Sequence, residues 1–181
     1  MDFIELLKNR RSCRKFVNKP VEKEKILTLV QSLLLSPSSR NRKPWEFIVV
    51  DDKRLLVELA KSKAKDMGSA LIEGAALAIV ILGDESIGDI WIEDTTIAAI
   101  ISQLTAETIG LKSCWVQIRG RRHAANVLAS DFVCSLLNIP SSKQVECIIA
   151  FGYPNEFREP HKVDELNYEK VFYNKYGSLK E

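Results

Sequence analysis

Residues 89–110 read DIWIEDTTIAAIISQLTAETIG, and no other segment constrains the architecture as strongly. Apolar side chains between Asp89 and Ile109 are spread so evenly around a helical turn that little polar face remains. A helix that is apolar nearly all round has to be buried. In a chain of 181 residues, we expect part of that burial to come from a partner subunit. Gly110 then supplies the residue type that commonly ends a helix.

Short apolar runs and amphipathic segments alternate on both sides of this helix. We expect further helices behind an Asp2 cap at the N-terminus, over 22–35, from 51 to about 65, and from a Ser130 cap to 137. Strands are expected over 47–50, 75–82, 113–118 and 145–151. This mixture predicts an α+β or α/β layered domain. The tail from Asn155 is polar with scattered aromatics, makes no core alone, and is expected to lie over another surface.

Length and charge exclude several classes of protein. A chain of 181 residues predicts one domain, and its 46% apolar and 28% charged residues argue against disorder. Its 26 basic and 24 acidic residues give a net charge of +2, which offers no electrostatic case for a nucleic-acid partner. The longest apolar run, residues 75–82, is far shorter than the roughly 20 residues of a membrane helix. With no leader pattern visible at Met1–Glu5, we expect a cytoplasmic location.

Metal and nucleotide signatures are missing from the sequence. The four cysteines form no C-x-x-C pair, and the two histidines do not accompany them. We therefore expect reduced thiols, no disulfide framework and no metal site. Neither G-x-G-x-x-G nor the P-loop pattern occurs, which disfavours a Rossmann or P-loop nucleotide site.

Four segments carry groups that could bind a small molecule, and each also has a plainer interpretation. The cluster 10–15 could cradle an anion, or its arginines could complement the end of the first helix. The Ser/Asn loop 37–45 could contact a heterocycle or only connect two elements. Strand 113–118 could face a ring or only bury Trp115. The basic run 119–123 could contact nucleic-acid phosphates or a small anion, or be a solvated loop.

In their order and spacing, these segments resemble the nitroreductase family of FMN-dependent flavoproteins. The blocks that carry the resemblance are RRSCRKF (10–16), SPSSRNRKPWEFIVV (36–50), WIEDTTIAAIISQLTAETIGLKSCW (91–115) and IIAFGYP (148–154). The likeness runs from about residue 2 to 176. It implies one α+β domain over 1–181, a sandwich whose antiparallel-dominated sheet is flanked by helices. It further implies an intertwined homodimer, with a C-terminal segment from about 155 to 181 that reaches across to the partner.

The resemblance also implies how the FMN phosphate is held. Arg10 and Ser12 would hold the phosphate, with Arg11 nearby, and Arg14 would lie toward the pyrimidine edge of the flavin. A cation near the C-terminus usually helps to bind the phosphate in this family, and Lys170 is the candidate here.

Two further sets of residues would contact the flavin ring. From the other subunit, the Ser/Asn loop would approach the isoalloxazine through Pro37, Ser38, Ser39 and Asn41. From the same subunit as the arginines, the strand would run along the ring with Trp115, Val116 and Gln117. A backbone N–H of that strand is expected near flavin N5.

Some positions depart from the family pattern. Lys43 stands where glutamine is common, Lys112 replaces a frequent glycine, and Phe172 occupies a place where histidine is often found. Arg119 and Arg121 follow the strand where many relatives have short neutral residues. These two arginines could serve anions of the cofactor or substrate, or belong only to the surface.

The activity that the resemblance implies is a ping-pong reaction. NADH or NADPH delivers hydride to flavin N5 and leaves, and a nitroaromatic, a quinone or a similar electrophile takes its place. No catalytic side chain is required beyond the flavin; Arg14 could stabilise the charge of the reduced ring. One alternative is a specialised flavin enzyme of the same fold: a dehalogenase, a flavin-fragmenting enzyme or a metabolite dehydrogenase. Another is a non-enzymatic FMN-binding protein. Neither nucleic acid nor membrane is an expected partner.

Overall fold

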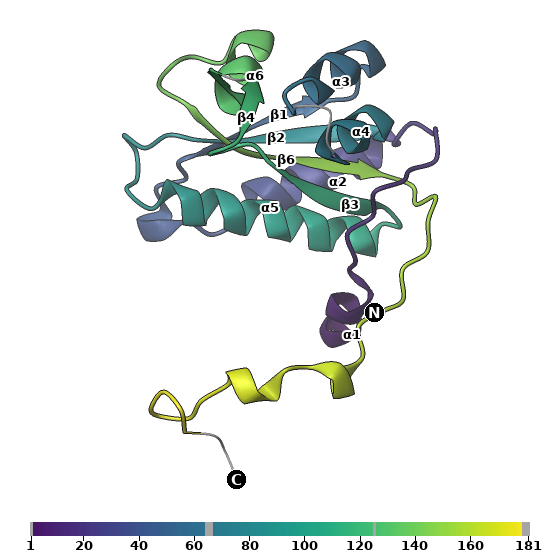
Figure 1. The fold of residues 1–181 in the computed structure, drawn as a ribbon, viewed down its shortest axis with the longest axis vertical. Helices are drawn as coiled ribbons and strands as arrows, with labels where there is room; N and C mark the ends of the chain where they lie inside the picture. Colours follow the sequence, from purple (N-terminus) through teal and green to yellow (C-terminus); the bar gives the residue numbers. More distant parts are fainter. Residues whose placement is uncertain (1, 64–66, 125, 179–181) are drawn as a thin grey trace.

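The computed structural model describes residues 2–63, 67–124 and 126–178 and is built around a four-stranded sheet (Figure 1). In spatial order the strands are β1 (Trp45–Val50), β2 (Leu77–Gly83), β6 (Gln144–Gly152) and β3 (Lys112–Gln117). All three neighbouring pairs are antiparallel. The prediction of an α+β fold with an antiparallel-dominated sheet is therefore confirmed.

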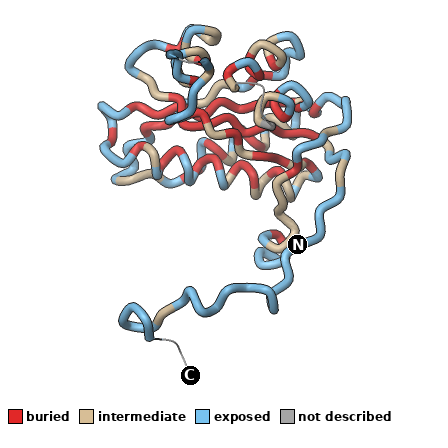
Figure 2. The backbone as a smooth tube through the Cα atoms, in the orientation of Figure 1, coloured by how far each residue is buried: buried red, intermediate tan, exposed pale blue. Residues whose placement is uncertain are grey.

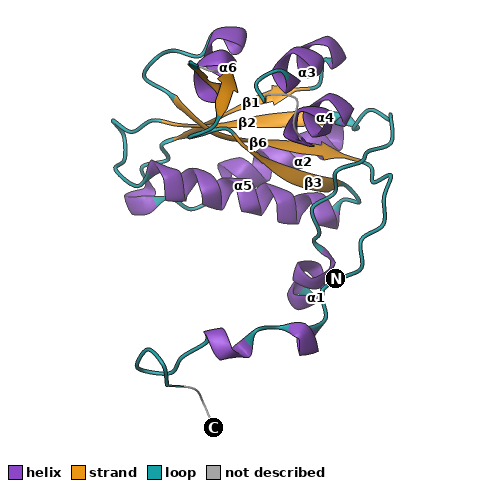
Figure 3. Cartoon of the chain, viewed as in Figure 1, coloured by secondary structure: helices purple, strands orange, loops and turns teal. Residues whose placement is uncertain are grey.

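Helices cover both faces of the sheet (Figure 3). One face carries α2 (Lys23–Leu34) and α5 (Trp91–Thr108). The other carries α3 (Lys53–Ala60), α4 (Met67–Gly74) and α6 (Ala129–Leu137). Alternate side chains of β2 enter the two cores, so Ile79 packs with the α2–α5 layer and Val80 with the opposite layer. Burial on both faces explains why β2 and β6 are continuous apolar runs.

Helix α5 confirms the helix that the sequence predicted between Asp89 and Ile109, and it packs on one face of the sheet. Gly110, with a φ of +74°, directly follows the residue that caps its C-terminal end. Its first turn packs so closely on β2 that a Cβ at Gly83 would lie 2.3 Å from the Trp91 ring, so only glycine fits there. On its outer side, Ile97 and Ile100 each remain 38% exposed. The expectation that a partner covers this helix stays a prediction.

The ends of the elements correct several details. The Asp52 side chain accepts a hydrogen bond from Leu55 N (2.8 Å) and caps α3. Asp2 precedes α1 (Phe3–Asn9) without a capping bond from its side chain. The Ser130 cap was wrong, because α6 already begins at Ala129. The sequence also gave no sign of α4 or of the hairpin β4 (Arg122–Ala124) and β5 (Val127–Leu128). The expected end of the third helix near residue 65 lies outside the described residues.

Beyond Asn155 the chain leaves the sheet and runs past α1 away from the body (Figure 1). Nearly all of this tail is exposed (Figure 2), including its short helical turns η2 (Val163–Glu165) and η3 (Tyr168–Lys170). A backbone hydrogen bond from His161 N to Lys8 O (3.0 Å) ties the tail to α1. Apolar rings on it, such as Phe157 and Tyr176, are largely exposed. Within the described ranges, every helix is too short or too polar to cross a bilayer.

Candidate functional site

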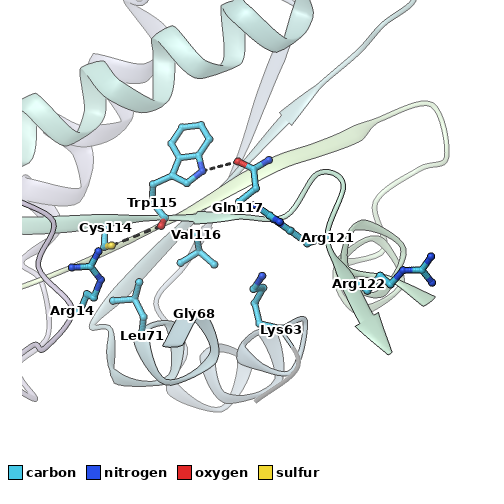
Figure 4. A pocket seen from close by; sticks show the side chains of 10 residues that line it. All are labelled: Arg14, Lys63, Gly68, Leu71, Cys114, Trp115, Val116, Gln117, Arg121 and Arg122. Atoms are coloured by element: carbon cyan, nitrogen blue, oxygen red, sulfur yellow. Dashed lines mark hydrogen bonds between the residues drawn. The ribbon is translucent and has the colours of Figure 1, made fainter. Parts of the chain in front are cut away.

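A cavity of about 480 Å³ opens beside β3, on the face that α4 covers (Figure 4). Four parts of the chain meet there: the N-terminal segment, α4 with Lys63 ahead of it, β3, and the segment that follows β3. The lining residues are Arg14, Lys63, Gly68, Leu71, Cys114, Trp115, Val116, Gln117, Arg121 and Arg122. The volume lies within the range of small-molecule sites, roughly 300–1,000 Å³.

The N-terminal segment reaches this cavity because it is laid along the outer edge of β3. The backbone N–H of Cys13 donates to the carbonyl of Ser113 (3.0 Å). Further along, Phe16 forms a β-bridge with Pro154 and packs so close to Gly152 that a side chain at that glycine would collide with it. This docking brings the predicted arginine segment and the predicted strand together. Burial raises the pKa of the Cys114 thiol, and Arg14 and Ser12 both lie near enough to the thiol to oppose this rise.

Strand β3 presents backbone donors to the cavity side. The carbonyl of Ser113 points outward to Cys13, and backbone groups alternate along a strand, so the N–H groups of Trp115 and Gln117 point to the same edge. The Trp115 indole points away from Val116 (Figure 4) and packs in the α2–α5 core. Its Nε1 donates to Gln117 Oε1 (2.9 Å). Trp115 is thus a core side chain whose backbone lines the cavity.

The charge of the lining is positive. Arg14, Lys63, Arg121 and Arg122 contribute cations, and no acidic residue is among the described lining residues. Arg119 instead forms an ion pair with the buried Glu146. The structure therefore separates the two arginines whose roles were left open: Arg119 has a structural partner, and Arg121 faces the cavity. An anionic ligand would be favoured in such a cavity.

The cysteines are not poised as nucleophiles. All four are free. Burial raises the pKa of each of them, and in Cys114 it does so against the opposing charge of Arg14. These groups stay thiols near neutral pH and act in packing. In the ranges that the structure describes, no three His, Cys, Asp or Glu side chains gather as metal ligands would.

The Ser/Asn loop lies at the opposite edge of the sheet. Pro37, Ser38, Ser39 and Asn41 precede β1, and β1 and β3 are the two outer strands. The loop ends in strained backbone, because Arg40, Asn41 and Lys43 have φ between 51° and 55°. The tail that carries Lys170 likewise runs away from the sheet. None of these predicted residues lines the cavity of its own chain.

Asp94 holds this loop and was missed by sequence analysis. Its side chain is buried at the start of α5, where Oδ1 accepts a hydrogen bond from Ser39 N (2.8 Å). Ser38 Oγ accepts a second bond from Lys43 N (2.8 Å) and closes the loop on itself. The available signal was the pair of acidic residues Glu93 and Asp94 in the first turn of a mostly apolar helix.

Comparison with known proteins adds to this geometry. Residues 7–73 and 60–153 match the profile of the Nitroreductase family. An FMN-dependent nitroreductase from Clostridium difficile superposes with a TM-score of 0.93 at 43% identity, covering 96% of this chain and 100% of that one. An NADPH:FMN oxidoreductase from Vibrio harveyi, solved with NAD+, gives a TM-score of 0.79 at 25% identity over 98% of this chain and 79% of that one. A protein of Archaeoglobus fulgidus, provisionally named NADH dehydrogenase/NAD(P)H nitroreductase, is 28% identical over 90% of this chain and 91% of its own.

Proposed function

The chain belongs to the Nitroreductase family, and from this premise we propose that it passes hydride from NADH or NADPH through FMN to nitroaromatic, quinone or similar electrophilic acceptors. Membership makes it an FMN-dependent oxidoreductase with a nicotinamide co-substrate. The acceptor class and the ping-pong order are proposed here in addition to that family membership.

One observation carries this proposal: the N-terminal arginine segment is laid along the open edge of β3, and its Arg14 lines a cationic cavity together with that strand. Arg10, Arg11 and Ser12 are not among the described lining residues of this cavity. A flavin has a flat ring with hydrogen-bonding edges and a phosphate on a flexible chain. The edge of β3 supplies outward N–H groups for the ring, and Val116 and Leu71 supply apolar contact. The residues present therefore fit FMN.

The roles of individual residues follow the same arrangement. We assign Arg10 and Ser12 to the phosphate, with Arg11 beside them, and Arg14 to the pyrimidine edge. Arg11 Nη1 also donates to the carbonyl of Glu159, so it links this segment to the tail. Trp115, Val116 and Gln117 lie along the ring in this assignment.

We further propose that the site is completed by a second copy of the chain. The loop carrying Pro37, Ser38, Ser39 and Asn41 lies at the far edge of the sheet from the cavity, so one chain cannot present both to one flavin. The exposed rings of the tail and the exposed isoleucines of α5 need a covering surface. A homodimer of single domains, with residues from about 155 reaching across, supplies the loop, Lys170 and that surface together.

When bound, FMN supplies the hydride-accepting and hydride-donating atom N5. The chain itself would orient the flavin ring and stabilise the charge of its reduced form. The β3 N–H groups fix the ring edge, and the cation of Arg14 stabilises negative charge that reduction places on the pyrimidine side. The same open face serves donor and acceptor in turn, which is the reason for a ping-pong order. No protein acid or base is needed.

An absorption experiment tests the proposal. Purified protein is supplemented with FMN, desalted, and recorded anaerobically before and after NADH or NADPH. We expect flavin bands that travel with the protein, bleach with the nicotinamide, and return when a nitroaromatic or a quinone is added. A protein that fails to retain FMN contradicts the proposal. Retained flavin that never bleaches contradicts the reductase activity and favours a non-enzymatic carrier or a different reductant.

A further inference from the structure

The segment assigned to the FMN phosphate is fixed at both ends by consecutive residues of β3. At its start, Lys112 Nζ donates to the carbonyl of Asn9 (3.1 Å). At its end, Cys13 N donates to the carbonyl of Ser113 (3.0 Å). The residues between these two bonds are Arg10, Arg11 and Ser12. Two fixed ends restrict the conformations open to so short a segment, so β3 determines where these side chains lie.

Lys112 is itself held by a buried carboxylate. Glu107, near the end of α5, forms an ion pair with it. The Glu107 side chain is 4% exposed and that of Lys112 is 29% exposed. A carboxylate so deeply buried needs a cation in contact, which keeps the ammonium group in one place. The remaining donors of that group are then available to the Asn9 carbonyl.

Glu107 also interacts electrostatically with Arg10 of this segment. Burial raises its pKa, while the charges of Lys112 and, more weakly, Arg10 oppose the rise. Its second oxygen, Oε1, is buried and has no hydrogen-bond partner in the described ranges. Neither Glu107 nor Lys112 lines the cavity. Their contacts lead instead to the backbone that carries Arg10.

We propose that Glu107 and Lys112 are positioning residues for phosphate recognition. The pair fixes the Asn9 carbonyl and thereby sets Arg10 and Ser12 for the phosphate of FMN. The inference rests on the proposed function, because it requires that FMN is the ligand. It assigns a role to Lys112, the position where the sequence departs from a frequent family glycine.

A positioning role and a purely electrostatic role of Glu107 predict opposite changes in FMN affinity when this carboxylate is removed. A carboxylate near a phosphate site repels the phosphate, so its removal alone should tighten FMN binding. If Glu107 acts by positioning, its removal should weaken FMN binding instead. Riboflavin has the same ring and no phosphate, so its affinity should not change in either case.

The experiment measures the dissociation constants of FMN and riboflavin for the full-length apoprotein by quenching of flavin fluorescence. The variants are Glu107→Met, Lys112→Met and the double variant. We expect each to lower the preference for FMN over riboflavin by about tenfold, the scale on which residues that orient a ligand-binding group act. Riboflavin affinity should stay within about twofold, because riboflavin has no phosphate for this segment to bind. A full factor of ten would correspond to about 1.4 kcal/mol. The double variant should be no worse than either single one, because the pair acts as a unit.

Two further variants complete the design. Lys143→Met removes another largely buried lysine paired with carboxylates, at the other end of the sheet, and should leave the preference unchanged. Lys112→Arg keeps a cation able to bridge Glu107 and Asn9 and should restore most of it. If a single variant fails to fold, the double variant decides the question, because it leaves no unpaired buried charge.

The possible outcomes distinguish a failure of the proposed phosphate site from a failure of the positioning role. Wild-type protein that binds neither flavin, or shows no preference for FMN, overturns the proposed phosphate site itself. Wild-type preference that persists in the Glu107 and Lys112 variants overturns the positioning role and leaves the proposed function standing. A Glu107→Met variant with tighter FMN binding shows that the carboxylate acts only through its charge.

Discussion

Arg14 comes from the N-terminal segment and lines the cavity together with Cys114 and Leu71 (Figure 4). In the proposed flavin site, a cation at this place would stabilise the reduced flavin more than the oxidised one, because negative charge appears only on reduction. Its contribution to hydride transfer is therefore separable from its contribution to binding.

We expect Arg14→Ala to retain part of the FMN and to slow reduction by NADH about tenfold, which is 1.36 kcal/mol in the barrier. Stopped-flow bleaching of the flavin under anaerobic, single-turnover conditions measures this rate. Arg14→Lys should lose less, since it keeps the charge. Arg54→Ala, which removes an exposed arginine of α3, serves as the control. A rate unchanged in Arg14→Ala would remove this residue from the electrostatic role.

At the other end of the sheet, Lys143 joins Glu46 and Asp84. The Ser86 hydroxyl, and then Lys143, lower the pKa of Asp84 to about 2. The two carboxylates in turn raise the pKa of Lys143. The lowered carboxyl pKa stabilises the fold above the ordinary value of 3.8, and this stabilisation disappears as the pH falls toward 2. The raised pKa of Lys143 stabilises the fold below the ordinary lysine pKa of 10.5. This stabilisation is lost when the pH rises beyond the pKa that Lys143 has in the folded protein.

For Lys143→Met we therefore expect a lower free energy of unfolding between about pH 4 and pH 10, and a difference from wild type that shrinks toward pH 2. Urea unfolding followed by circular dichroism at pH 7 and at acidic pH measures both quantities. Curves that stay parallel down to pH 2 would contradict the coupling of Lys143 to Asp84.

Among the elements, the loop before β1 depends on one buried side chain of another element. Asp94 is 2% exposed and accepts a hydrogen bond from the Ser39 N–H. Just after Ser39, three non-glycine residues of the loop adopt left-handed backbone. Such strain persists only where surrounding contacts impose it. We expect Asp94→Ala to destabilise the fold by about 1–3 kcal/mol, because Ser39 N–H loses its acceptor, and to weaken FMN binding through the displaced loop.

Asp89→Ala provides the matched control for that variant. Asp89 lies just ahead of the same helix, and its contact with Arg42 (3.6 Å) is an exposed ion pair. Exposed pairs contribute at most about 1 kcal/mol. Urea unfolding and FMN titration of both variants measure the two effects. Equal losses in Asp89→Ala and Asp94→Ala would mean that the loop is not held by Asp94.

The elements that the sequence predicted well are those whose burial leaves a pattern in the chain. Strands β2 and β6 are apolar throughout because both of their faces are covered, and α5 is apolar nearly all round. Helix α4 was missed because MGSALIEG is short and carries a glycine near each end. The hairpin of β4 and β5 was missed because its strands have three and two residues, too few for any periodicity.

The same distinction applies to the candidate site. Arg14 and the β3 residues were predicted because they lie in contiguous motifs. Lys63, Gly68 and Leu71 reach the cavity through contacts between distant segments, which no local pattern records. Asp94 was missed for the same reason, since its partner Ser39 is 55 residues away in the chain. The roles of the predicted contacts, Lys170 and the loop residues included, stay predictions.

For the whole molecule, the proposed dimer ties cofactor binding to assembly. Ile97 and Ile100 lie one turn apart on the outer face of α5, each 38% exposed. We expect Ile100→Glu to yield a monomer that also loses FMN, because a charge would be buried at the interface and the loop of the second copy would be absent. Light scattering after size exclusion, with the flavin absorbance of the same peak, measures both.

Val127→Glu is the control for this variant. Val127 is 40% exposed on β5, over the layer of helices opposite α5. This variant should stay dimeric and keep its flavin. An Ile100→Glu protein that remains a dimer would contradict the interface, and a monomer that binds FMN as tightly as wild type would contradict the shared site.

The outer edge of β3 has one more effect, on how the protein is produced. Past the bond from Cys13 to Ser113, this edge points its N–H groups outward, and no further strand of the described residues lies beside it. An uncovered edge is a template on which other chains can pair. In the proposed enzyme the flavin covers it, so newly made chains are protected only once they have found their cofactor. The recovery of folded protein should therefore follow the flavin supply of the producing cell, and a riboflavin-starved host should return more of the chain as aggregate.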